Sequence, residues 1–168
     1  MIAKISGVTY NPPRTTGQTT AYASSTAERV TTSVIIPGGS LRQYDQIGID
    51  SRVIKSGANG TVTVRIRIGT ALNTSQTLVA TYTSTSASHT FVPIMRRLAI
   101  ANIANSTYVL TSTGSLSWDF TSPSAGFENI STINWASDQY IIITTQCVSA
   151  SDTVYCPYII TDFMCNLK

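Results

Sequence analysis

The stretch Thr61-Val-Thr-Val-Arg-Ile-Arg-Ile68 alternates strictly between polar and apolar side chains. A period of two is typical of a β-strand with one face in a core and the other face outside it. The turn-forming residues 57–60 precede this stretch, and a second polar segment, residues 70–75, follows it. The sequence therefore predicts a strand over residues 61–68, with Val62, Val64, Ile66 and Ile68 in the core.

The same rhythm continues on both sides of this strand, with no helical period. Short alternating runs separated by Gly, Pro, Asn and Ser predict roughly nine strands, which is the pattern of a sandwich or jelly roll. We therefore expect an all-β fold, an antiparallel jelly-roll-like β-sandwich. The predicted strands cover residues 31–36, 46–54, 61–68, 76–84, 89–100, 108–113 with 116–120 as a hairpin, 130–135, 139–148 and 154–165.

The first thirty residues differ from the rest. Pro12 and Pro13 exclude a helix or a central strand there, so residues 1–30 are predicted to form an extended N-terminal arm plus an edge strand. The sandwich itself is expected over residues 31–168. Ile2, Ile5 and Tyr10 give the arm apolar anchors, and we expect the arm to order on a neighbouring subunit or another partner. The alternative is a dispensable tail.

Charge is sparse and unevenly distributed. Charged residues make up 11% of the chain and the net charge is +3, which is too small to indicate nucleic-acid binding. Seven basic residues lie from Arg42 to Arg97, whereas residues 98–167 carry five acids and no Lys or Arg. This separation is expected of a scattered solvated surface, the alternative being a head-to-tail or subunit–subunit surface with complementary signs.

Four arginines are the candidate interface residues of the body. Arg65 and Arg67 share the non-core face of one strand, and Arg96 and Arg97 form an adjacent basic pair. Guanidinium groups suit pairing with carboxylates of neighbouring subunits. Arg96 interrupts an apolar face, where burying an unpaired charge costs free energy. At a three-fold axis, three copies of this residue could meet acceptors or water, and we therefore predict a homotrimer.

No set of residues supports catalysis. The single histidine, His89, has no nucleophile motif near it, and the carboxylates of the C-terminal half lie on separate segments. The three cysteines are spaced by nine, unlike the short pairs of zinc sites, and phosphate or calcium loops are missing. We expect a non-enzymatic protein without cofactor or metal. No apolar run could span a membrane, and no secretory signal is recognisable.

Cysteines and tryptophans leave alternatives open. Cys147 and Cys156 flank a turn signal and could form a disulfide across a hairpin, or, with Cys165, remain small buried thiols. Trp118 and Trp135 lie near turns. We expect them to pack in the core, and the alternative is that they are candidate carbohydrate contacts, because exposed aromatic rings can stack on sugars.

Two segments together resemble jelly-roll modules of tailed-bacteriophage virion proteins. One is Gly60-Thr-Val-Thr-Val-Arg-Ile-Arg-Ile-Gly-Thr70, preceded by residues 44–53; the other is Thr77-Leu-Val-Ala-Thr-Tyr82, running into the long segment 91–100 with its basic pair. The resemblance spans about residues 30–165. It implies a virion component, usually trimeric: a capsid decoration protein, a head fibre or a tail-fibre tip.

This resemblance carries no catalytic residues, and the chain shows no fibre shaft before the module, which favours a compact capsid decoration protein. Its expected partners are the major capsid protein or other virion proteins, and neighbouring copies of itself. The alternative is a tail-associated adhesin that binds a host-surface glycan or receptor.

Overall fold

The computed structural model describes residues 22–23, 26–84, 86–88, 90–110, 127–130 and 132–164. These residues form β-strands joined by turns, with no helix among them, and so none that could cross a membrane. The strands are β1 (Tyr22–Ala23), β2 (Arg29–Ile36), β3 (Gln46–Ser56), β4 (Val62–Gly69), β5 (Thr77–Thr83), β6 (Phe91–Asn102), β7 (Ser106–Leu110), β8 (Phe127–Ile130), β9 (Gln139–Cys147) and β10 (Thr153–Met164).

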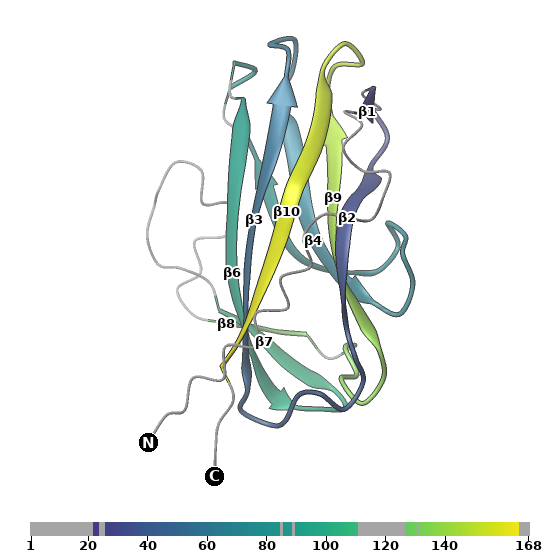
Figure 1. Ribbon diagram of the computed structural model, residues 1–168, viewed down its shortest axis with the longest axis vertical. Coiled ribbons are helices and arrows are strands. Elements are labelled where there is room, and N and C mark those ends of the chain that lie inside the picture. The colour runs from purple at the N-terminus through teal and green to yellow at the C-terminus, as the bar shows by residue number, and fades with distance from the viewer. Residues whose placement is uncertain are drawn as a thin grey trace.

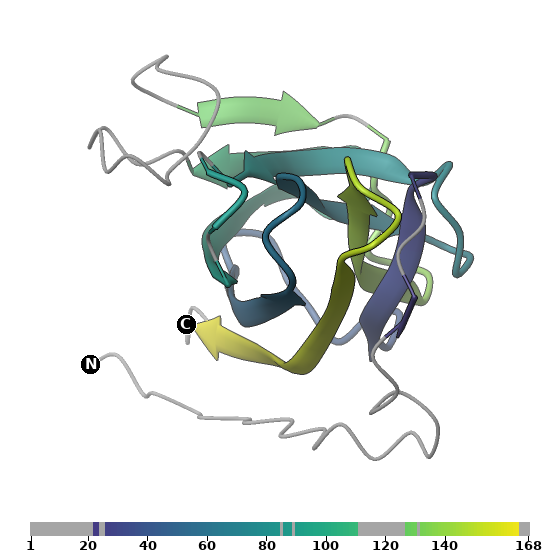
Figure 2. The same cartoon turned by 90° about the horizontal axis from the view of Figure 1, so that it is seen from above.

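Two antiparallel sheets pack face to face (Figures 1 and 2). Sheet A has the order β1-β10-β3-β6-β7-β8, and sheet B has the order β2-β9-β4-β5. The pairs β1·β10, β2·β9, β3·β6 and β4·β5 are nested inside one another, as in a long hairpin folded over twice. This nesting is the jelly-roll order, with β7 and β8 added at one edge of sheet A. The predicted all-β sandwich is confirmed.

The core lies between the sheets and follows the alternation that the sequence shows. Val62, Val64, Ile66 and Ile68 of β4 are each 0% exposed, whereas the side chains between them are partly exposed on the outer face of sheet B. Burying each such branched side chain contributes about 1.5–3 kcal/mol. Sheet A contributes core residues in the same way, including Ile47, Ile49, Val53, Ile94, Leu98 and Ile100.

Alternation fails in β5 because of a register irregularity. The sequence places Leu78, Ala80 and Tyr82 on one face, but the pairing of β4 with β5 shifts between Ile66 and Arg67. Leu78 is therefore 46% exposed, and Val79 takes the inward position at 6%. An irregularity of this kind turns the side chains on one side of it to the opposite face.

The strand expected over residues 130–135 does not form. Ile130 is the last residue of β8, and the chain then makes a turn in which Trp135 is 1% exposed. The Trp135 indole N–H donates to Thr107 Oγ1 at 2.8 Å, and its backbone bonds to Gly39 and Ile103. The apolar residues that suggested a strand thus anchor a turn in the core. The hairpin partner expected over 116–120 lies outside the described residues.

Loops gather at the two ends of the sandwich (Figure 1). The upper loop end joins β1 to β2, β3 to β4, β5 to β6 and β9 to β10; the described residues of the last three connections are 57–61, 84, 86–88, 90 and 148–152. The lower loop end joins β2 to β3, β4 to β5, β6 to β7 and β8 to β9; its described residues are 37–45, 70–76, 103–105 and 132–138.

Candidate functional site

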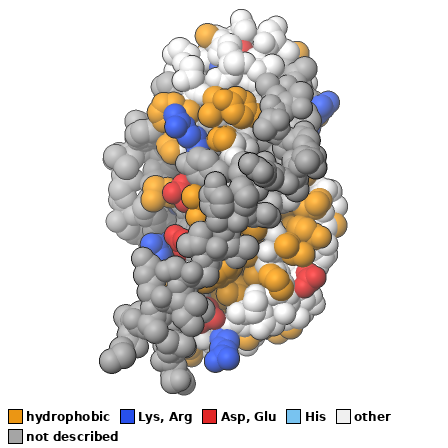
Figure 3. All heavy atoms as spheres, in the orientation of Figure 1, with side chains coloured by type: hydrophobic (Ala, Val, Ile, Leu, Met, Phe, Trp, Pro, Cys, Tyr) orange, Lys and Arg blue, Asp and Glu red, His pale blue; other side chains and the backbone are white. Residues whose placement is uncertain are grey.

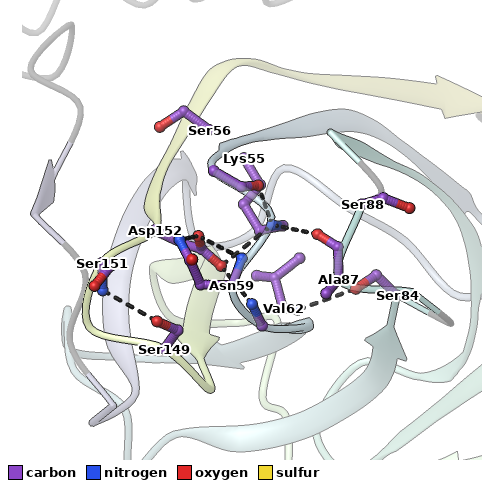
Figure 4. Close-up of polar contacts among 12 residues, drawn as sticks. Lys55, Ser56, Asn59, Val62, Ser84, Ala87, Ser88, Ser149, Ser151 and Asp152 are labelled. Carbon is purple, nitrogen blue, oxygen red and sulfur yellow. Dashed lines mark hydrogen bonds and ion pairs between the residues drawn. The ribbon is translucent and has the colours of Figure 1, made fainter.

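A buried ion pair lies beneath the upper loop end (Figure 4). Lys55, near the end of β3, places its Nζ 3.2 Å from Oδ2 of Asp152, and both side chains are 0% exposed. Nζ also donates to the carbonyl oxygens of Gly57 at 2.6 Å and Ala87 at 2.7 Å. The three acceptors match the three N–H donors of an ammonium group.

The carboxylate of Asp152 is equally well satisfied. Oδ1 accepts from the backbone N–H and the side-chain amide of Asn59, and Oδ2 accepts from the Gly60 N–H. Burial acts to raise the pKa of Asp152, but the hydrogen bonds from Asn59 and Lys55 outweigh burial and hold this pKa below its usual value. Gly57 has φ +88°, and a Cβ there would collide with Asp152 Oδ1.

This clasp, Lys55 with Asp152, connects the three upper loops that join β3 to β4, β5 to β6 and β9 to β10. Lys55 has no solvent access and no spare donor, so it is a structural group and not a nucleophile. The described residues of these three loops are mostly Ser, Thr, Asn, Ala and Gly. The one charged residue among them is Asp152, which is buried in the clasp. Figure 3 shows this end dominated by uncharged groups. The result is a fixed, neutral surface rich in hydroxyl groups.

At the lower loop end an exposed aromatic residue occupies an unusual backbone conformation. Tyr44 has φ +72° and a side chain that is 59% exposed. A bulky residue in this left-handed region costs about 1–2 kcal/mol relative to ordinary backbone. The Tyr44 N–H donates to the Ile100 carbonyl at 2.6 Å. Asp45, 1% exposed, accepts the Arg42 N–H on Oδ2 at 2.8 Å and the Ile100 N–H on its carbonyl at 2.9 Å.

These bonds fix the loop to β6, and they hold the strained residue with its ring exposed. Arg42 and Gln43 are also exposed beside it, and the Gln43 amide donates to the Ala101 carbonyl at 2.8 Å. A flat exposed ring next to two polar side chains, of which that of Gln43 is held by its bond to Ala101, suits a ligand with one apolar face and several hydroxyl groups. The sequence gives no signal for Tyr44, because no glycine marks the turn.

On the outer face of sheet B, Arg65 and Arg67 share a partner from their own chain. The Glu28 carboxylate lies 2.7 Å from Arg67 Nε and 3.3 Å from Arg65 Nη1, and it also accepts from the Thr144 hydroxyl. Burial acts to raise the pKa of Glu28, but the hydrogen bonds from Arg67 and Thr144 and the two positive charges outweigh it and lower this pKa. Both arginines therefore have a carboxylate partner within their own chain, and their place at a subunit interface stays a prediction.

Replacing Glu28 with glutamine is expected to lower the free energy of unfolding by about 1 kcal/mol at pH 7, because two adjacent guanidinium groups lose their common counter-charge. A carboxylate with a lowered pKa stabilises the fold above its unfolded-state pKa, and this contribution is lost as pH falls through the folded-state pKa. Urea denaturation should thus show the two proteins converging below about pH 4.5. Arg29→Gln, an exposed neighbour, should change stability by less than about 0.5 kcal/mol.

Arg96 and Arg97 lie elsewhere. The Arg96 guanidinium lies 5.1 Å from the centre of the buried Tyr82 ring, so its charge is stacked on an aromatic face within the chain. This contact removes the argument that Arg96 needs a three-fold axis, and the homotrimer stays a prediction. Arg97 donates to Met164 Sδ at 3.5 Å on sheet A. The four arginines therefore do not form one surface.

Other candidate residues are placed as follows. Trp135 is a core residue, as expected, and has no face for a sugar, so the alternative carbohydrate role is wrong for it. Cys147 and Cys156 are both free and buried, and burial raises the pKa of the Cys147 thiol, so no disulfide joins them. Trp118, Cys165, His89 and the arm residues Ile2, Ile5 and Tyr10 lie outside the described residues. Within the described part of the chain, no group of three or more His, Cys, Asp or Glu could hold a metal.

No protein-family model matches the chain, and no curated protein matches it either. Among solved structures, the chain is similar to the CBM2 module of Lactobacillus casei BL23 phage J-1 evolved Dit. The TM-score is 0.39 and the sequence identity 12%, over 81% of this chain and 69% of that chain. A likeness of this size establishes neither a family nor a ligand.

Proposed function

We propose that the chain is a non-enzymatic virion module of a tailed bacteriophage, a tail-associated adhesin that binds host-surface carbohydrate. The observation that carries this proposal is Tyr44, a strained residue whose ring is 59% exposed. A ring this exposed gains little from packing, and strain that the surrounding structure maintains is concentrated at binding sites. The virion assignment rests on the sequence resemblance, with which the jelly-roll strand order agrees.

The chemistry at Tyr44 fits a pyranose ring. Its aromatic face supplies apolar contact area, and the exposed Arg42 and Gln43 supply donors for sugar hydroxyls. One such site gives weak affinity. Several copies on one particle raise the overall affinity by about 10²–10⁴, because the second binding event becomes intramolecular.

Capsid decoration is the second candidate, and the outer face of sheet A favours it. Phe91 and Met95 on β6 are 42% and 71% exposed, and the Arg52 guanidinium lies 4.6 Å from the Phe91 ring centre. Aromatic residues, Met and Arg are enriched at protein interfaces. Figure 3 shows apolar and basic side chains next to each other on the face of sheet A turned toward the viewer. This face would contact the major capsid protein or a neighbouring subunit.

Immunogold labelling of purified particles separates the two candidates. We expect label at the tail tip and binding of the isolated protein to host-envelope carbohydrate on a glycan array. Label spread over the head, together with no binding to any glycan, would contradict the adhesin proposal and support capsid decoration. Mass-spectrometric absence of the chain from particles would contradict both.

A further inference from the structure

The loop between β3 and β4 contains the dipeptide Asn59-Gly60, and both residues bind the buried carboxylate of Asp152. Oδ1 accepts from the Asn59 backbone N–H at 3.1 Å and from the Asn59 side-chain amide at 2.9 Å (Figure 4). Oδ2 accepts from the Gly60 N–H at 2.9 Å, beside the Lys55 ammonium group. One carboxylate therefore holds an asparagine side chain together with the backbone nitrogen that follows it.

These two groups are the reactants of asparagine deamidation. In that reaction the following backbone nitrogen attacks the side-chain Cγ, a new N–Cγ bond closes a succinimide ring, and the Cγ–Nδ2 bond breaks. The leaving nitrogen takes up the proton that the backbone nitrogen loses, and it departs as ammonia. Water then opens the ring at either carbonyl and leaves aspartate or isoaspartate. A following glycine permits the attack most readily, because it has no Cβ to hinder close approach.

We propose that Asn59 is a deamidation site that the clasp holds unreactive, and that its conversion to aspartate or isoaspartate opens the upper loop end. The Gly60 nitrogen becomes a nucleophile only when it gives up its proton. Its hydrogen bond to Asp152 favours the protonated N–H, and the carboxylate charge opposes formation of an amide anion. The attack therefore requires the loop to move away from Asp152, which is a local opening of the fold.

The fold requires this reactive dipeptide at this position. A Cβ on residue 60 would lie 2.8 Å from the Ser149 backbone nitrogen and 3.1 Å from the Val148 Cβ, so the close packing of the two loops favours glycine. Residue 59 supplies a side-chain donor to Asp152 Oδ1, which an asparagine amide can do and a carboxylate cannot. The sequence contains one Asn-Gly pair, and that pair is the one in the clasp.

The product of deamidation is incompatible with the clasp. Asn59 is exposed although Asp152 is 0% exposed, so water can reach the succinimide ring and hydrolyse it. The new carboxylate replaces a donor with an acceptor and faces the charge of Asp152, and two carboxylates at hydrogen-bond distance repel each other. Lys55 already has Asp152 and two carbonyl oxygens as acceptors. Once the loop has opened and reacted, the clasp cannot form again.

The rate of deamidation tests the protection. Peptide mapping by mass spectrometry of the full chain, stored at neutral pH, should show Asn59 deamidating at least about tenfold more slowly than in a synthetic peptide of residues 55–64, which lacks Asp152. Equal rates in the chain and the peptide would overturn the proposal. Asn105, exposed at the lower loop end, is the reference within the same molecule.

The combination of Lys55→Met with Asp152→Asn, which removes the acceptor of the Gly60 N–H, should bring the rate at Asn59 close to that of the peptide and leave the rate at Asn105 unchanged. An unchanged rate at Asn59 in this variant would overturn the role of the clasp. If both rates rise, the variant has unfolded, and the comparison of the unchanged chain with the peptide still decides.

Asn59→Asp tests the structural effect without waiting for the reaction. Hydrogen exchange measured by mass spectrometry should be at least about tenfold faster in peptides covering 57–61 and 148–152, and unchanged in peptides covering 70–76 at the lower loop end. Asn105→Asp is the matched control and should leave exchange at the upper loop end unchanged. Exchange in Asn59→Asp equal to that of the unchanged protein would overturn the proposed opening.

Discussion

Replacing Lys55 with methionine is expected to lower the melting temperature by about 10 °C or more. The change leaves Asp152 as a buried carboxylate without its counter-charge, and it removes the donor of two loop carbonyl oxygens. Breaking one side of a buried pair costs far more than the intact pair contributes, because the remaining charge cannot reach water. Thermal unfolding followed by circular dichroism measures the effect.

Two further variants make this test specific. Arg52→Met, on the exposed face of the same strand, should change the melting temperature by about 2 °C or less. Lys55→Met combined with Asp152→Asn should recover part of the loss, because asparagine carries no charge and its one amide oxygen still accepts in the place of Oδ1 from Asn59, while the bond from the Gly60 N–H is lost. If Lys55→Met melts like the unchanged protein, the clasp does not stabilise the upper loop end.

Lowering the pH should reduce the free energy of unfolding that the clasp contributes, because the pKa of Asp152 is lowered in the folded protein. A carboxylate whose pKa is lower in the folded state stabilises the fold above its unfolded-state pKa, here about 4. That contribution disappears as pH falls from there through the folded-state pKa. The unchanged protein should therefore lose stability more steeply below about pH 4 than the variant with both Lys55→Met and Asp152→Asn.

Replacing Tyr44 with alanine is expected to reduce carbohydrate affinity at least about tenfold, which is 1.4 kcal/mol. The ring supplies the apolar surface of the proposed site, while the backbone bonds of the loop do not depend on the side chain. Tyr44→Gly should lose affinity equally and raise the melting temperature by about 1–3 °C, because glycine adopts φ +72° without strain. Isothermal titration and thermal unfolding measure the two effects.

Leu72→Ala is the matched control for Tyr44, because Leu72 is 53% exposed at the same loop end. This variant should bind like the unchanged protein. Unaltered binding by Tyr44→Ala would remove the ring from the proposed site. A loss of stability in Tyr44→Gly would show instead that the ring packs against the fold, and that its exposure has no bearing on ligands.

The strands and their buried faces could be predicted from the sequence, because the alternation of polar and apolar residues within a short segment shows which side chains are buried. Residues 61–68 became β4 with the expected core face. The prediction of buried faces failed where the position of a side chain depends on a partner far away in the sequence or on a shift in strand register. Leu78 turns outward because of an irregularity in pairing, which alternation does not encode.

The candidate sites could not be predicted, because they are formed by contacts between residues far apart in the sequence. Glu28 meets Arg67 across 39 positions, and Lys55 meets Asp152 across 97, so neither pair leaves a pattern in any short window. Core packing of Trp135 was expected, but that it is reached through a turn bonded to Gly39 and Ile103 was not. For Tyr44 the sequence shows no glycine and no repeat, and only the backbone angle identifies it.

At the upper loop end, the residues that hold the loops together differ from the residues that form the exposed surface. The groups that hold the three loops together are two buried side chains, the amide of Asn59 and backbone atoms of Gly57, Gly60 and Ala87. Ala58 and Ser151 stand exposed, and their side chains have no part in these bonds. Such positions can mutate freely while the frame persists. The chemistry of this surface can therefore change by substitution at exposed positions while the fold of the module stays the same.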